Sequence, residues 1–288
     1  MKRIINVYKD VGSWIGPPPG FGDFLRGSAC LINWSQHGPL AGSFLPGVNV
    51  SMAAAAARFR SSPLHVPLEE SSIIGAEEIL EQDCTDRVRS LAEDFLHSDQ
   101  DTLAICTNAS WRGTQDALPP STMTELRRAF EFTDPFEAVV RNHRPAAPGY
   151  ILIHIRDRDR SELQSYFNKT PDPAAYALKE TAFRHRAENF TSQIVEAYPQ
   201  KPVVCMSNNH ELRDDLCRQH GLINPHTSIG NPGYRGALTD GELLDFALVR
   251  DASALYSLTY FPWNSGFTVW SSRLYSVWAQ FFNSMTPL

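Results

Sequence analysis

Short apolar runs alternate along this chain with longer segments of helical periodicity, a pattern typical of an α/β fold with largely parallel sheets. The clearest run is Tyr150–Ile155, which is rich in isoleucine, carries no charge, and fits a strand buried on both faces. It is followed at once by the charged run Arg156–Asp159. Ligands of open α/β sheets bind at the carboxyl ends of the strands, so these charges lie where a ligand is expected.

The alternation of a strand divides this segment into two sides. One side carries Leu152, His154, Arg156 and Arg158, and the other carries Ile153, Ile155 and Asp157. A histidine inside a buried strand, followed two residues later by an arginine, needs polar partners. A buried strand whose last residues surface into a solvated run of charges explains the same pattern, and the residues alone leave both interpretations open.

The same reasoning assigns the other elements. Strands are expected at Arg3–Tyr8, Phe44–Met52, Ser62–Leu68, Thr102–Cys106, Lys201–Asn209 and Ala254–Tyr260. Helices are expected through Leu31–Trp34, at Glu77–Leu96, from Ser121, from Asp134, and at Asp172–Tyr198, His210–His220, Asp240–Ala252 and Phe267–Met285. Gly221 follows one of these helices at the position that glycine favours after a helix end.

The segment Arg144–Gly149 interrupts this periodicity with two prolines and a glycine, so it is the expected linker. It divides the chain into an N-terminal α/β domain, residues 1–145, and a C-terminal Rossmann-like domain, residues 146–288. The predicted architecture is two α/β layers with a cleft between them, and the last helix is expected to pack back on the first domain.

Composition narrows the possible functions. The 288 residues carry a formal net charge of −6, which argues against a general nucleic-acid binder. The five cysteines are scattered, as expected for reduced thiols in a reducing compartment. No apolar run is long enough for a signal peptide or a transmembrane helix. We therefore expect a cytoplasmic protein, either free or peripheral at the inner membrane.

A glycine-rich turn follows the first expected strand and opens a helix with Gly20, Gly22 and Asp23. Glycines let the backbone approach an anion, and a helix N-terminus offers free N–H groups. The spacing is neither the full dinucleotide-binding pattern nor a P-loop. An ordinary strand-to-helix turn with Asp23 as a cap explains it equally well.

Four short motifs, in order, resemble the fucosyltransferase superfamily, which contains α1,6-, α1,2- and protein O-fucosyltransferases. His154-Ile155-Arg156-x-x-Asp159 is similar to the H-x-R-x-x-D motif of that group. The others are Gly20-Phe21-Gly22-Asp23, Ser207-Asn208-Asn209 and Asn264-Ser265-Gly266-Phe267, which resemble the first glycine turn, a strand end and a late serine-rich motif. The motifs extend across nearly the whole chain.

The resemblance implies a GT-B-like fold, GDP-fucose as donor substrate, and no metal or other cofactor. Without a metal, a departing diphosphate needs cationic donors, and an arginine fork matches its oxygens. The resemblance assigns Arg156 to the β-phosphate, His154 to the donor or the loop, and Asp159 to orienting Arg156 or the sugar. It further assigns donor contacts to Gly20, Gly22, Ser207, Asn208, Asn209, Ser265, Gly266 and Phe267.

The implied reaction is an inverting displacement at the fucose anomeric carbon by a hydroxyl of a glycan or glycolipid. Asp23, Asp157 and Glu162 are candidates for the general base. The chain departs from the family at Asp157, where many relatives have a second basic residue, and at Asn208-Asn209, where relatives have an acidic pair. It is also shorter than the α1,6 enzymes, and its oligomeric state is not readable from the sequence.

Two alternatives compete with this assignment. Asp157-Arg158-Asp159 is also a D-x-D sequence after a strand, as in metal-dependent glycosyltransferases that use other nucleotide sugars. A non-catalytic module that only binds a nucleotide sugar fits as well, because the sequence identifies no general base with certainty.

Overall fold

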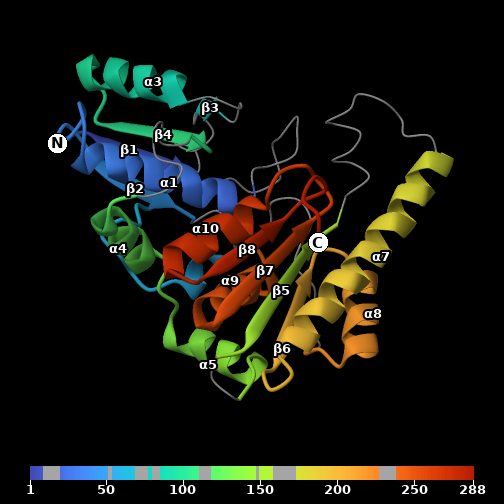
Figure 1. Cartoon of the computed structure of the whole chain (residues 1–288). Helices are drawn as coiled ribbons and strands as arrows, with labels where there is room; N and C mark the ends of the chain where they lie inside the picture. Colours follow the sequence, from blue (N-terminus) through green and yellow to red (C-terminus); the bar gives the residue numbers. More distant parts are fainter. Residues whose placement is uncertain are drawn as a thin grey trace. The chain divides into compact units, whose positions relative to one another are not determined.

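The computed structural model describes residues 1–8, 20–50, 54–68, 77–79, 85–109, 118–146, 149–157, 173–226 and 238–288. The chain divides into two compact units. Unit 1 comprises Met1–Ala138 and Arg235–Thr239, and unit 2 comprises Val139–Tyr234 and Asp240–Leu288. Each unit contains a four-stranded sheet, and every pair of neighbouring strands is parallel (Figure 1). The predicted α/β class with largely parallel sheets is therefore confirmed.

The sheet of unit 1 has the strand order β2-β1-β4-β3. Its strands are β1 (Arg3–Val7), β2 (Leu45–Asn49), β3 (Glu77–Ile79) and β4 (Thr102–Thr107). Its helical elements are α1 (Phe21–Gln36), the 3-10 helix η2 (Ala54–Arg58), α3 (Thr85–His97) and α4 (Pro120–Ala129). Helix α5 (Asp134–His143) runs across the division between the units.

Asn6 anchors helix α1 to this sheet. Its amide nitrogen donates to the Phe24 carbonyl at 3.1 Å and to the Ser28 hydroxyl at 3.0 Å, and its amide oxygen accepts from the Thr107 N–H at 3.1 Å. The helix approaches so closely that a Cβ on Gly27 would lie 2.0 Å from the Thr107 carbonyl oxygen. A buried amide and a glycine thus fix the helix against β1 and β4.

The sheet of unit 2 has the strand order β6-β5-β7-β8. Its strands are β5 (Ile151–Arg156), β6 (Val203–Ser207), β7 (Ala254–Thr259) and β8 (Ala279–Phe282). Its helices are α7 (Pro173–Ala197), α8 (His210–His220), α9 (Asp240–Asp251) and α10 (Gly266–Tyr275). Helix α8 ends as predicted, with Gly221 in the left-handed conformation at φ 65°.

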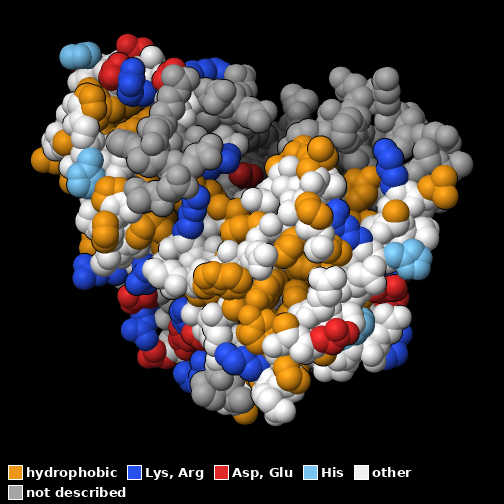
Figure 2. Space-filling view, in the orientation of Figure 1, with side chains coloured by type: hydrophobic (Ala, Val, Ile, Leu, Met, Phe, Trp, Pro, Cys, Tyr) orange, Lys and Arg blue, Asp and Glu red, His pale blue; other side chains and the backbone are white. Residues whose placement is uncertain are grey.

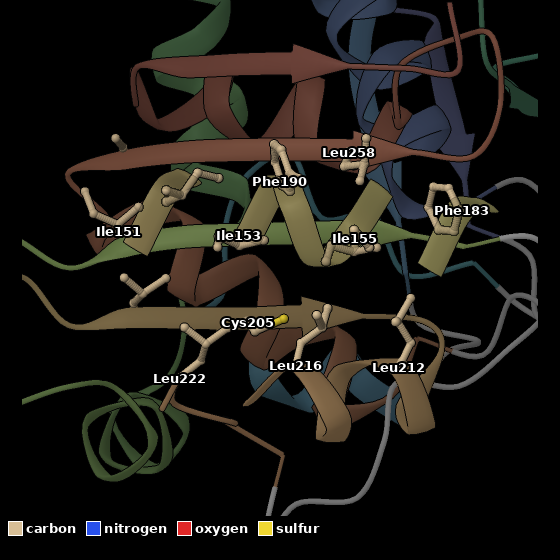
Figure 3. Packing of buried hydrophobic residues seen from close by; sticks show 14 residues of the cluster. Ile151, Ile153, Ile155, Phe183, Phe190, Cys205, Leu212, Leu216, Leu222 and Leu258 are labelled. Carbon is tan, nitrogen blue, oxygen red and sulfur yellow. The ribbon is translucent and has the colours of Figure 1, made fainter. Parts of the chain in front are cut away.

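The core of unit 2 lies between one face of β5 and the helices α7 and α8. Ile151, Ile153 and Ile155 alternate along β5 and point toward these helices (Figure 3). Among the side chains that cover them are Phe183 and Phe190 of α7 and Leu212 and Leu216 of α8. Because the isoleucines lie on the face of β5 toward α7 and α8, His154 and Arg156 lie on the opposite face, as predicted from the alternation.

The predicted last helix, Phe267–Met285, is wrong beyond Tyr275. Ser276 takes a left-handed conformation at φ 57°, which ends α10, and strand β8 follows. Strand β8 pairs with β7, and Phe282 packs edge-to-face on Phe190 with ring centroids 5.3 Å apart. Tyr275 ends α10 and Phe282 ends β8, so the helical spacing of Tyr275, Trp278 and Phe282 concealed the change from helix to strand.

Two other element predictions in unit 1 need correction. The predicted helix Glu77–Leu96 begins only at Thr85, because residues 77–79 pair with β4 as strand β3 despite a composition that favours a helix. Residues 62–68 form no strand. They contain a turn and a single bridge from His65 to Val48, since Pro63 and Pro67 have no N–H to donate.

Candidate active site at the carboxyl edge of the second sheet

The carboxyl ends of β5, β6 and β7 meet at one edge of the sheet of unit 2. Arg156 ends β5, Ser207 ends β6, and α10 begins at Gly266, shortly after β7. Phe267 of α10 lies near His154, with ring centroids 5.9 Å apart. Except for Asp159, the predicted donor-binding residues of the second half are brought to this edge by the parallel strands.

The imidazole of His154 contacts a chain of buried hydroxyl groups on β7 and α10. Its Nδ1 lies 3.4 Å from the Ser257 hydroxyl, which lies 3.1 Å from the Thr268 hydroxyl, and Thr268 donates to the Ser265 carbonyl at 3.1 Å. These contacts connect the imidazole of His154 to the N-cap of α10.

Burial keeps His154 neutral. Desolvation, followed by the positive charge of Arg156, lowers the pKa of His154 to about 3. The residue is 8% exposed, and its hydrogen bond to Ser257 is long. A neutral imidazole with an acceptor nitrogen suits a hydroxyl or N–H donor on a ligand.

Arg156 reaches the surface beside an aromatic stack. Its guanidinium carbon lies 5.2 Å from the ring centroid of Phe261, within the range of a cation–π interaction. Phe261 in turn stacks on Trp263 with centroids 4.9 Å apart and an interplanar angle of 18°. The Arg156 carbonyl accepts from the Tyr260 N–H at 2.9 Å, which ties the end of β5 to the same loop.

Asp157, Asn208 and Asn209 form a clamp between the ends of β5 and β6. The Asn208 side chain accepts from the Asp157 N–H at 2.8 Å and donates to the Asp157 carbonyl at 3.0 Å. Asn209 donates to the Asp157 carboxylate at 2.6 Å and caps α8 by accepting from the Leu212 N–H at 3.0 Å. The two departures from the fucosyltransferase motifs are therefore in contact, and each accommodates the other.

The start of α10 provides a site with anion-binding character. Ser265 is the N-cap, is 2% exposed, and makes no side-chain capping bond, and the first turn contains no acidic residue. Backbone N–H groups at such a helix start point outward with the positive end of the helix dipole. Ser265, Gly266 and Phe267 thus lie where a diphosphate would be favoured.

The predicted residues of the first half lie in unit 1. Gly20 is the N-cap of α1 with an extended backbone, and Gly22 is buried in its first turn. Asp23 forms an ion pair with Arg26 at 3.3 Å, and Arg26 Nε donates to the Asn108 carbonyl at 2.6 Å. Asp23 is therefore not the N-cap but an acidic residue of the first turn of α1.

Three predicted residues, Arg158, Asp159 and Glu162, lie outside the described residues. The sequence reasoning missed the support of His154 by Ser257 and Thr268, although Ser257 lies directly opposite His154 in the register of β5 and β7. It also missed a buried pair at 2.7 Å between His226 Nε2 and the carboxylate of Asp245 on α9. Neither His226 nor Asp245 belongs to a recognisable motif.

The described residues contain neither a metal-binding cluster nor a membrane-spanning helix. No group of three or more His, Cys, Asp or Glu suited to a metal ion occurs among the residues with described positions. Within those same ranges, no helix is long and apolar enough to cross a bilayer. On the face shown in Figure 2, charged side chains of both signs are scattered among neutral ones, with no large basic patch.

Comparison with known proteins finds fucosyltransferases. The chain is similar to the fucosyltransferase NodZ from Bradyrhizobium, with a TM-score of 0.57 and 14% identity, over 95% of this chain and 92% of that one. The NodZ α-1,6-fucosyltransferase co-crystallised with GDP gives 0.54 and 13% over the same shares. Apo POFUT1 gives 0.55 and 9% over 98% and 97%.

No model of a protein family matches the sequence, and no curated protein sequence matches it. At these identities the structural likeness defines the fold of the chain, which is the α/β fold of these fucosyltransferases. The fold expected from the sequence motifs is confirmed.

Proposed function

We propose that the protein is a glycosyltransferase that transfers fucose from GDP-fucose to a hydroxyl group of a glycan or glycolipid. The observation that carries the proposal is the meeting of Arg156, neutral His154 and the start of α10 at one sheet edge. This edge lies in a fold shared with NodZ, which was co-crystallised with GDP. In this proposal unit 2 holds the donor, and residues 1–145 serve the acceptor side.

The proposed reaction is one inverting displacement. The acceptor oxygen forms a bond to the anomeric carbon of fucose while the bond from that carbon to the β-phosphate oxygen breaks, and GDP departs with the electron pair. Arg156 and the N–H groups at the start of α10 neutralise the charge that develops on the diphosphate, so no metal is needed. The acceptor proton passes to a carboxylate, with Asp23 and Glu162 as the candidates.

The remaining site residues have supporting roles in this proposal. His154 binds the donor through Nε2, and Ser207, Asn208 and Asn209 shape the loop that receives the nucleotide. Asp159 orients Arg156 or the sugar, and Gly20 and Gly22 allow close approach of the first loop. Cysteines outside any disulfide, such as Cys205 and Cys217, are consistent with action in the cytoplasm.

The metal-dependent alternative is less favourable. Asp157 is 4% exposed, and its carboxylate accepts from Asn209 inside the clamp rather than standing open for a cation. A D-x-D site needs both aspartates as oxygen ligands at the metal or sugar nucleotide. A non-catalytic module would bind the same nucleotide sugar but would not transfer or hydrolyse it.

Calorimetric titration with GDP, GDP-fucose, UDP and UDP-sugars, first in EDTA and then with Mn²⁺, tests this proposal. We expect GDP binding in EDTA that Arg156→Ala weakens by roughly 100-fold, as for loss of a charged phosphate contact. Arg184→Ala is the control, because Arg184 pairs only with the surface carboxylates Glu180, Glu211 and Asp215 in the contacts described here. Metal-dependent UDP binding would favour the D-x-D alternative.

Turnover separates an enzyme from a binding module. We expect release of GDP from GDP-fucose, slowly to water and faster with a suitable glycan. GDP binding without any transfer or hydrolysis across a panel of glycan acceptors would favour the non-catalytic module. No nucleotide binding under any condition would refute the proposal.

A further inference from the structure

The turn that follows β8 is closed on itself and presents its carbonyl groups together. The Asn283 side chain accepts from the Met285 N–H at 3.0 Å and from the Thr286 hydroxyl at 2.9 Å, and the Thr286 N–H donates to the Asn283 carbonyl at 3.0 Å. These bonds form a compact four-residue turn, residues 283–286. Its remaining carbonyl lone pairs need donors.

Arg186 of α7 supplies those donors. Its guanidinium donates to the carbonyls of Asn283 at 2.8 Å, Ser284 at 3.4 Å, and Thr286. No carboxylate takes part in these contacts, although carboxylates are the usual partners of a surface arginine. Burial lowers the pKa of Arg186, because desolvation penalises the charged guanidinium.

The turn is bonded to the loop beside Arg156. The Ser284 N–H donates to the Phe261 carbonyl at 3.0 Å, and the Phe261 N–H donates to the Thr259 hydroxyl at 3.2 Å. Phe261 is 2% exposed, and its ring faces the guanidinium of Arg156. Arg186 is thus connected to Arg156 through one turn and one aromatic ring.

We propose that Arg186 is a positioning residue for Arg156, acting through the turn at residues 283–286 and the ring of Phe261. This inference rests on the proposed function only in taking Arg156 as the phosphate ligand. A long arginine side chain loses rotamer entropy when it binds, and an aromatic face that already holds its guanidinium reduces that loss. Without Arg186, the turn releases Phe261, and Arg156 samples orientations that do not bind phosphate.

Arg184, two residues earlier on α7, is the matched control. Arg184 carries the same charge as Arg186 and lies on the same helix. Its described contacts, however, are ion pairs with Glu180 at 3.9 Å, Glu211 at 3.8 Å and Asp215 at 3.6 Å. Arg184→Gln and Arg186→Gln therefore remove the same charge from the same helix, and only the second removes donors from the turn.

The first measurement needs no nucleotide. In the free protein, the Nε–Hε resonance of Arg156, assigned by its absence in Arg156→Lys, should be displaced upfield by the ring current of Phe261. We expect Arg186→Gln and Phe261→Leu to abolish that displacement and Arg184→Gln to preserve it. An unchanged Arg156 resonance in folded Arg186→Gln would overturn the inference. If that variant does not fold, Arg186→Lys, which keeps the charge but not the fork, replaces it.

The second measurement is a double-mutant cycle for GDP affinity. We expect Arg186→Gln to weaken GDP binding about 10-fold and to have little further effect in an Arg156→Lys background, since the lost interaction is the same one. Equal losses in both backgrounds would indicate a general structural role and would overturn the inference. Absence of GDP binding in the unmutated protein would refute the proposed function, and the resonance measurement would still decide the role of Arg186.

Discussion

Asn6 and His154 occupy equivalent places in the two units and are held very differently. Each is the fourth residue of a strand that lies second in the order of its sheet. Each is buried, with 0% and 8% of its surface exposed. Among the residues that the structure describes, Asn6 makes three hydrogen bonds between 3.0 and 3.1 Å with α1 and β4, whereas the side chain of His154 makes one, at 3.4 Å.

This difference in hydrogen bonding distinguishes Asn6, which attaches a helix to its sheet, from His154, which we propose binds a ligand. Asn6 is satisfied by the protein itself, so its burial contributes to the attachment of a helix. His154 keeps an acceptor nitrogen at an edge that also presents Arg156 and a helix start. A buried polar group that is incompletely hydrogen-bonded lowers the stability of the fold. The burial of His154 in this state therefore favours a functional role for its side chain. The following predictions test this contrast, beginning with the largest expected effect.

Replacing Asn6 should damage the fold and spare the site. We expect Asn6→Leu to lower the free energy of unfolding by about 3 kcal/mol, because the Thr107 N–H loses its buried acceptor and α1 loses its two bonds to the Asn6 amide. Urea unfolding measures this loss, and GDP affinity of the folded fraction should be unchanged. A loss below about 1 kcal/mol would show that the Asn6 bonds are not structural in the sense proposed.

Replacing Asn209 by aspartate tests the clamp at the edge of the second sheet. In the unmutated protein, the Asp157 carboxylate accepts from the Asn209 amide at 2.6 Å. The Asn209→Asp variant retains an oxygen to cap α8, but it replaces that donor by a second carboxylate. We expect a loss of about 2 kcal/mol at neutral pH, reported by urea unfolding. Asp157→Asn in the same chain should restore most of the loss, and failure to do so would contradict the pairing.

The acid stability of the protein should report the burial of His154. The pKa of His154 is about 3 in the folded protein and near 6.5 when unfolded, so the unfolded state binds the extra proton between these values. The contribution of this group to stability is therefore complete above pH 6.5 and falls below it, by up to about 1.4 kcal/mol per pH unit.

His154→Leu should remove that part of the slope and gain stability at pH 5, while it weakens GDP binding about 10-fold. The control is His185→Gln, a histidine at 71% side-chain exposure, which should leave the slope unchanged. An identical slope in His154→Leu would mean that this histidine is not buried in the neutral form.

The sequence predicted the parts of the fold that follow a single strong pattern. The isoleucines of β5, the strand β6 and the glycine after α8 were all correctly placed, because periodicity and backbone preference act locally. The segments 77–79 and 279–282 were assigned to helices because their strand character depends on pairing with β4 and β7. Such pairing is a property of distant residues, so local propensity cannot report it.

The sequence patterns indicated which polar residues would lie at the candidate site, but they did not show which residues support them. His154 and Arg156 were identified from an unusual strand, and motif resemblance added Ser265 to Phe267. The hydroxyls of Ser257 and Thr268, the ring of Phe261 and the guanidinium of Arg186 come from other elements without a shared motif. Their roles arise from the register of β5 with β7 and from the turn after β8.

The wide sequence separation between paired strands has a consequence for synthesis on the ribosome. Ile151 of β5 pairs with Ala254 of β7, so a newly made β5 waits for about a hundred further residues before one of its edges is covered. An uninterrupted aliphatic segment would be prone to aggregate during that interval. His154 interrupts the isoleucines of β5 and Arg156 follows the last of them, so the same two residues that we assign to the donor would protect the nascent chain.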